Sequence, residues 1–179
     1  MDGKYSFSLA RDQLAQSGLK TGQAMSPADV ERLKDTASFG KLRDLSYKWL
    51  GLRLRSEYEI DEYLKRKTAD NQLAKRLKEE LKLYNYVDDD KFASAWISSR
   101  RAVKPASKYR LKRELLQKRV PLEIIDQQLD QAGLDDIAAA RDIISRRRAR
   151  YADERKLMAY LARQGFSYDT IKQALAEDE

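Results

Sequence analysis

Three stretches of this chain carry the same arrangement of paired apolar residues, and this repetition limits the fold more than any other feature of the sequence. In each stretch, two apolar residues four positions apart are followed after nine or ten residues by a second such pair. A spacing of four places both side chains on one helical face, and the gap accommodates a tight turn between two helices. The pairs are Ile60/Leu64 with Leu73/Leu77, Leu111/Leu115 with Ile125/Leu129, and Leu157/Leu161 with Ile171/Leu175.

A further apolar segment precedes each helix pair, so each repeat contains three helices. These segments carry Leu45, Trp49 and Leu52, then Phe92, Trp96 and Ile97, then Ile137, Ala140 and Ile144. Leucine outnumbers valine 23 to 4 in the sequence, which favours helices over strands. We therefore predict an all-α fold, an elongated tandem array of three three-helix repeats over residues 39–87, 88–133 and 134–179.

Residues 1–38 have a different character and are predicted to form a small strand-containing N-terminal segment. Residues 5–9 alternate apolar and polar side chains with the period of a strand. Ser26 and Pro27 are a cap residue and a proline at a first helical position, which predicts a short helix ending near Lys34.

The composition excludes several classes of function because the chain has no cysteine and no histidine. Disulfides, thiolate or imidazole metal sites and Ser-His-Asp catalysis are therefore impossible. The acidic cluster Asp88, Asp89 and Asp90 is most simply a helix start, where acids favour the positive end of the helix dipole. We expect no catalytic residue, metal, cofactor or small-molecule substrate. With no long apolar run and no secretory signal pattern, we also expect no membrane association and a cytoplasmic location.

The positive charge of the chain is concentrated in the second repeat. Nine basic residues and one acid, Glu114, lie between Trp96 and Arg119, whereas Val120 to Ala140 contains five acids and no base. A basic run can be an ordinary solvated face, but such a face usually mixes both signs. We therefore predict a surface for an acidic partner, either a protein groove or nucleic acid. It comprises Arg100, Arg101, Lys104, Lys108, Arg110, Lys112, Arg113, Lys118 and Arg119, with Arg146, Arg147, Arg148 and Arg150 from the third repeat.

Four segments resemble motifs of the RecX family, bacterial regulators of the RecA recombinase, and the resemblance extends from Phe39 to Ala176. The most specific is LYNYVDDDKFASAW at residues 83–96, which is similar to the family's linker into its second repeat. The others are SEYEI at 56–60, LKRELLQKRV at 111–120 and RQGFSYDTI at 163–171. The resemblance implies a non-enzymatic protein that binds the RecA–single-stranded DNA filament and inhibits its ATPase, recombinase and coprotease activities in DNA repair and SOS control.

Two other functions are compatible with the same residues. The first is a stand-alone, basic helical module that binds single- or double-stranded DNA without a recombinase; Tyr109 and Tyr151 lie among its basic residues and could stack on bases. The second is a metal-dependent nuclease that uses Asp88, Asp89 and Asp90. The family resemblance favours the RecA filament as the partner.

Overall fold

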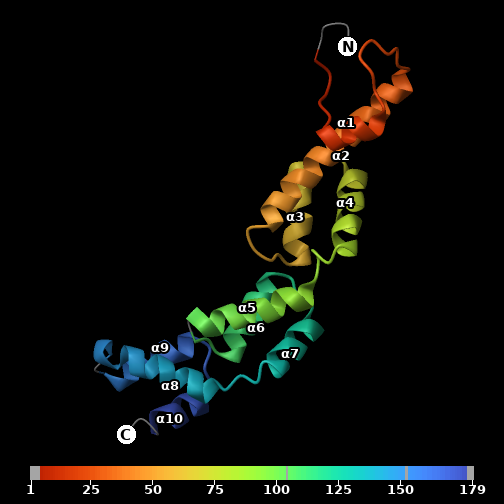
Figure 1. Ribbon diagram of the computed structural model, residues 1–179. Helices are drawn as coiled ribbons and strands as arrows, with labels where there is room; N and C mark the ends of the chain where they lie inside the picture. The colour runs from red at the N-terminus through yellow and green to blue at the C-terminus, as the bar shows by residue number, and fades with distance from the viewer. Residues whose placement is uncertain (1–4, 104, 152, 177–179) are drawn as a thin grey trace. The chain divides into compact units, whose positions relative to one another are not determined.

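The structure is a computed structural model that describes residues 5–103, 105–151 and 153–176, and these residues form helices and no strand (Figure 1). The α-helices are α1 (Arg11–Ser17), α2 (Pro27–Leu50), α3 (Glu57–Lys67), α4 (Asn71–Leu83), α5 (Asp89–Val103), α6 (Lys108–Gln117), α7 (Leu122–Gln131), α8 (Asp136–Arg147), α9 (Glu154–Arg163) and α10 (Tyr168–Ala176). A short 3-10 helix, η1 (Arg148–Arg150), follows α8. The all-α prediction is confirmed.

The chain divides into two compact units. The first contains the residues up to Leu54 together with Ile60–Val87, and the second contains Arg55–Glu59 and the residues from Asp88 onward. The core of the first unit is built by α2, α3 and α4, and it buries the predicted residues Ile60, Leu64 and Leu77. Trp49 packs against this core with its ring stacked on Tyr63 at a centroid distance of 4.1 Å.

The second unit contains two separate cores, one for each three-helix group. Helices α5, α6 and α7 enclose one core, and helices α8, α9 and α10 enclose the other. The predicted pairs Leu111/Leu115, Ile125/Leu129 and Leu157/Leu161 are all buried. In the last predicted pair, Ile171 is buried but Leu175 is only partly so, because Ala174 takes the innermost place on α10. Tandem three-helix repeats therefore fit the structure.

The predicted N-terminal strand is wrong. Residues 5–10 have no regular secondary structure, and they are followed directly by α1. The alternating pattern did not produce a strand because a strand needs a hydrogen-bonded partner, and the described residues contain no other strand.

The predicted short helix starts where expected but continues much further. Ser26 caps α2 by accepting a hydrogen bond from the backbone N–H of Asp29 at 3.1 Å. The helix then runs to Leu50 through Gly40, which does not interrupt it. Gly40 leaves room for the buried Gln13, because a Cβ atom there would lie 2.1 Å from the side-chain nitrogen of Gln13 and would force this side chain to move. Gln13 in turn donates to the carbonyl of Thr36 at 2.7 Å and so holds α1 against α2.

Candidate functional site

Four of the nine basic residues predicted in the second repeat lie on α6, which presents two contrasting faces. Ser107 caps this helix by accepting a hydrogen bond from the N–H of Arg110 at 3.1 Å. Leu111 and Leu115 are buried in the core, so the helical period turns Tyr109, Arg113 and Leu116 toward solvent. The side chains of Tyr109 and Leu116 are 58% and 43% exposed. The outer face of α6 therefore combines positive charge with apolar surface.

Two of the predicted arginines are held by a single acid, Glu114. Its carboxylate accepts hydrogen bonds from Arg100 at 2.8 Å, from Arg110 at 3.1 Å and from the indole N–H of Trp96 at 2.9 Å. Burial alone would raise the pKa of Glu114, but these hydrogen bonds and the charge of Arg100 outweigh burial and hold the pKa below its ordinary value. Arg100 also lies 4.7 Å from the Trp96 ring centroid. Glu114 therefore fixes the two guanidinium groups as part of the fold.

Three more predicted cations are engaged within the second unit. Arg101 donates to the carbonyl of Ala132 at 3.0 Å. Ion pairs join Lys112 to Asp126 at 2.5 Å and Lys118 to Glu59 at 2.7 Å. Lys104, another predicted residue, lies outside the described residues. The folded unit therefore presents fewer free positive charges to a partner than the number of basic residues in this part of the sequence suggests.

Arg113, Arg119 and Lys108 have exposed side chains, and within the described part of the chain none is ion-paired with a carboxylate. The Arg113 guanidinium lies 5.8 Å from the Tyr109 ring centroid, and that of Arg119 lies 5.9 Å from the Tyr58 ring centroid. Arg119 also has a backbone φ of 57°, a left-handed conformation that disfavours residues other than glycine.

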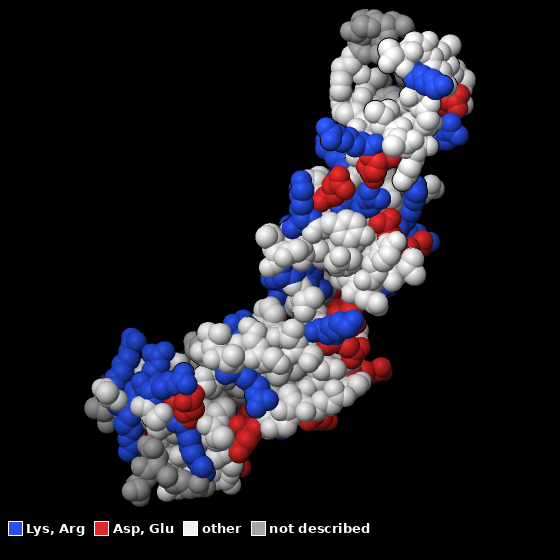
Figure 2. All heavy atoms as spheres, viewed as in Figure 1, with Lys and Arg blue, Asp and Glu red and all other residues white. Residues whose placement is uncertain are grey.

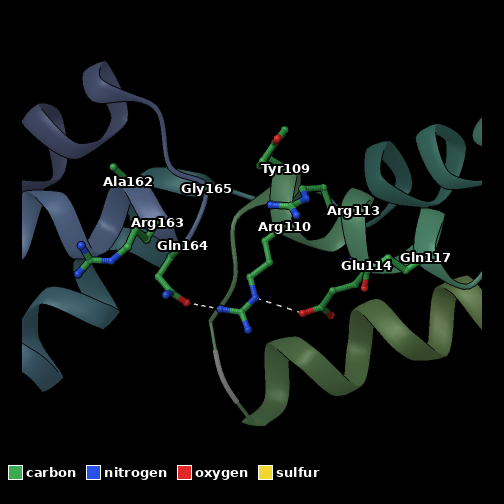
Figure 3. Close-up of a pocket in the computed structure, with 9 residues that line it drawn as sticks. All are labelled: Tyr109, Arg110, Arg113, Glu114, Gln117, Ala162, Arg163, Gln164 and Gly165. Carbon is green, nitrogen blue, oxygen red and sulfur yellow. Dashed lines mark hydrogen bonds and ion pairs between the residues drawn. The ribbon is translucent and has the colours of Figure 1, made fainter.

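Two hollows flank the outer face of α6. One, of about 510 Å³, lies between α6 and the turn from α9 to α10 (Figure 3). Figure 3 shows the Arg110 side chain between Gln164 and Glu114 and joined to both, while Arg163 points away from Arg110. The other, of about 480 Å³, is lined by Arg113, Leu116, Gln117 and Arg119. Arg113 and Gln117 border both hollows, which makes the outer face of α6 the centre of the candidate site.

The predicted arginines of the third repeat form a second basic group. Arg146 pairs with Asp142 at 2.9 Å, and Arg147 lies 5.5 Å from the Tyr160 ring centroid. Arg148 and Arg150 are exposed on η1. In Figure 2, basic side chains gather over α9 and the end of α8, whereas several acidic side chains lie along the edge of the second unit near α7 and the start of α5. The two basic groups line different hollows.

A joint between the second and third repeats involves residues that the sequence interpretation missed. The buried Ser107 hydroxyl donates to the carbonyl of Gln164 at 2.9 Å, and the N–H of Lys108 donates to the carboxylate of Asp136 at 2.9 Å. The same pair of contacts occurs earlier, where Ser56 donates to the carbonyl of Lys118 and Glu57 donates to Asp89. Serine and aspartate at matching repeat positions were the available sequence signal.

The acidic cluster Asp88, Asp89 and Asp90 lies at the start of α5, where Asp88 caps the helix and Asp89 takes part in the earlier of these two joints. Asp88 accepts a hydrogen bond from the N–H of Lys91 at 2.9 Å, and Asp90 accepts one from Gln128 at 3.3 Å. Burial raises the pKa of Asp89 above its ordinary value, and the hydrogen bond from Glu57 only partly offsets this effect. The helix-start interpretation agrees with these contacts.

None of the helices in the described part of the chain has the length and apolar character needed to cross a bilayer.

Two family models match the sequence, one described as the second three-helix domain of RecX over residues 88–129 and one described as its third three-helix domain over residues 135–175. These ranges correspond to the two helical groups of the second unit.

Proteins named regulatory protein RecX match all or nearly all of the chain. The protein from Bacillus licheniformis is 29% identical over 188 residues, covering 100% of this chain and 71% of its own length. That from Streptococcus uberis is 27% identical over 176 residues, covering 96% of this chain and 68% of its own. A crystal structure of regulatory protein RecX has a TM-score of 0.75 at 21% identity, covering 99% of this chain and 90% of the other. The RecX structure from Lactobacillus salivarius has a TM-score of 0.68 at 18% identity, covering 78% and 96%.

Proposed function

The chain belongs to the RecX family, and we propose from this that it is a non-enzymatic regulator that binds the RecA–single-stranded DNA filament. In this proposal it inhibits the ATPase, recombinase and coprotease activities of RecA in the cytoplasm, and so acts in DNA repair and SOS control. Its means of action is occupation of a surface, and no step of chemistry is required of its own residues.

The observation that carries the proposal is the outer face of α6, where Arg113 and Arg119 are exposed beside Tyr109 and Leu116. Arginine and tyrosine are enriched at protein interfaces, where they often contribute most of the binding energy. A guanidinium group can also hold a carboxylate or phosphate through two parallel hydrogen bonds. This face therefore suits an acidic surface of the filament, and contacts of this kind should weaken as salt rises.

The test is hydrolysis of ATP by RecA on single-stranded DNA with increasing amounts of this protein. We expect inhibition below one protein per RecA at low salt, with inhibition declining as salt increases. Absence of inhibition at low salt contradicts the proposal.

A comparison of two charge-reversal variants identifies which basic group of the protein contacts the filament. One variant combines Arg113→Glu with Arg119→Glu on the second repeat, and the other combines Arg146→Glu with Arg150→Glu on the third. Arg110 is unsuitable for this purpose, because it bridges Glu114 and Gln164 and its reversal would disturb the fold. Unchanged inhibition by both variants would remove both basic groups from the interface.

The exposed Tyr109 ring, with Arg113 beside it, favours one alternative, a module that binds DNA by itself. In that case the protein should bind bare single-stranded DNA firmly. The logarithm of its affinity should fall with the logarithm of salt by about 0.7 for each phosphate contacted. Firm filament binding with weak binding to bare DNA favours the regulator.

A further inference from the structure

We infer that the outer face of α6 and the turn after it bind an acidic, partly apolar segment of a partner protein, with Arg113 and Arg119 holding carboxylates and Leu116 contacting an apolar side chain. The inference deepens the proposed function, on which it rests where the partner is RecA, because it names the chemistry that this face recognises. The other ligand of opposite charge, a nucleic-acid strand, is an outcome of the test below.

The backbone of Arg119 is the first support for this assignment. Arg119 follows the end of α6, and Gly165 holds the corresponding position after α9. Both residues have left-handed backbones, with φ values of 57° and 91°. Glycine adopts this conformation freely, whereas arginine is strained in it. A left-handed residue commonly ends a helix, and glycine would do so here without strain. Arginine stands there instead, and its exposed guanidinium is the part of Arg119 that a partner can use.

The mixture of side chains is the second support. The hollow of about 480 Å³ has two arginines, one leucine and one glutamine on its wall, and Tyr109 lies beside it across Arg113. The Leu116 side chain is 43% exposed, although it lies on a helix whose opposite face fills the core. A leucine gives no advantage toward a phosphodiester backbone, but it can bury an apolar side chain of a peptide. The Gln117 amide can both donate to and accept from peptide groups.

The negative charges around this face are the third support. Glu114 lines the hollow on the other side of Arg113. Helix α7 of the same repeat carries Glu123, Asp126 and Asp130, and the sequence from Val120 to Ala140 contains no base. A nucleic-acid strand has a charge on every nucleotide and is best held by an uninterrupted positive path. A peptide can place separate carboxylates at Arg113 and Arg119 and avoid the neighbouring acids.

The first experiment uses the full chain and a fluorescein-labelled peptide in which glutamate and leucine alternate. Fluorescence anisotropy should show binding by the unaltered protein at low salt. The affinity should fall by about tenfold or more in the Arg113→Glu, Arg119→Glu variant, since truncating or reversing paired charges at an interface has effects of this size. The matched control combines Lys41→Glu with Lys75→Glu, two exposed residues of the first unit, and should bind within about twofold of the unaltered protein. Failure of the unaltered protein to bind the peptide overturns the inference without reference to RecA.

The second experiment measures the same variants against RecA filaments and against a bare thymidine oligonucleotide. Filament affinity should fall by about tenfold in the Arg113→Glu, Arg119→Glu variant, while oligonucleotide affinity should change by no more than the control's. Equal losses for filament and oligonucleotide would identify nucleic acid as the ligand and overturn the inference. Unchanged filament binding would also overturn it, while leaving the proposed function intact if the unaltered protein still inhibits RecA. Peptide binding without filament binding by the unaltered protein would support the inference and contradict the proposed function.

A cross-linking measurement identifies the ligand directly. The Arg119→Lys variant keeps the positive charge and adds an amine that carbodiimide couples to a carboxylate in contact with it. With RecA filaments, mass spectrometry should find this amine joined to an acidic segment of RecA that also contains apolar residues. Coupling only to segments without that character overturns the inference.

Discussion

Replacement of Ser107 by alanine should lower the free energy of unfolding by more than the loss of an ordinary helix cap does. The excess measures the contact between the second and third repeats. The Ser107 hydroxyl is fully buried and has two roles, since it accepts from the N–H of Arg110 at 3.1 Å and donates to the carbonyl of Gln164 at 2.9 Å. The first contact lies within the second repeat, and the second contact reaches the third repeat.

The cost of Ser107→Ala follows from these two contacts. Loss of the cap destabilises by about 1 kcal/mol. The carbonyl of Gln164 then loses its partner in a partly buried position, which adds about 1–2 kcal/mol. The expected decrease in the free energy of unfolding is therefore about 2–3 kcal/mol.

Urea unfolding followed by tryptophan fluorescence measures this decrease. A Trp49→Phe background leaves Trp96 as the sole tryptophan, and Trp96 packs against the core of the second repeat. The matched control is Ser167→Ala, which removes an exposed cap of α10 that accepts only from within its own turn, with an expected cost of about 1 kcal/mol. Equal losses in the two variants would show that the contact with Gln164 contributes nothing, and would refute the reasoning.

Three further outcomes are expected. The pKa of Glu114 in the folded protein lies below its ordinary value of 4.5. Ionised Glu114 therefore stabilises the protein above pH 4.5, and this stabilisation is lost as the pH falls through the folded pKa. The urea midpoints of Glu114→Gln and the unaltered protein should accordingly converge in acid. Arg119→Gly should raise the free energy of unfolding by up to about 1 kcal/mol in urea, because glycine relieves the left-handed strain. In Gly40→Ala the new methyl group displaces Gln13 from its bond with Thr36 at a cost of about 1–2 kcal/mol, which offsets the gain of about 1 kcal/mol from helix propensity. The net loss in thermal unfolding should therefore be at most about 1 kcal/mol.

Two of these outcomes have a control within the chain. Asn85 has the same φ of 57°, but asparagine tolerates the left-handed region, so Asn85→Gly should gain less than Arg119→Gly. In a Gln13→Ala background, Gly40→Ala should become stabilising by about 1 kcal/mol through helix propensity. A convergence of midpoints in alkali, an equal gain at both left-handed positions, or a Gly40→Ala effect independent of residue 13 would contradict the respective explanations.

The helical repeats were predictable because their signal is local and occurs in several copies. Apolar pairs such as Leu111/Leu115 fix a helical face without knowledge of what packs against it. The strand predicted over residues 5–9 failed because strand formation depends on a distant partner, which a local pattern cannot supply. The helix predicted to end near Lys34 continues to Leu50 as α2, and Gly40 within it leaves the space that the Gln13 side chain occupies.

The sequence locates the basic residues along the chain, but it does not tell which of them pair with acids inside the fold. The sequence places nine basic residues between Trp96 and Arg119, yet Glu114 alone accepts from two of them in the folded unit. Which basic residues form ion pairs within the fold depends on where acids distant in the sequence, such as Glu59 and Asp126, lie in space. Domain bounds and partner-binding residues inferred from the sequence stay predictions.

The residue type at the start of the second helix of each repeat is related to the contact between neighbouring repeats. Ser56 and Ser107 each accept a backbone N–H of their own helix and donate to a carbonyl of a later turn. A hydroxyl can do both at once, whereas an ionised carboxylate can only accept. The start of α9 carries Asp153, which accepts from the N–H of Arg155 at 2.9 Å. Aspartate is as good a cap as serine, so capping alone does not distinguish the three positions. The need to donate to a neighbouring repeat does distinguish them, and it explains why serine is buried at the two positions where a later turn approaches the cap.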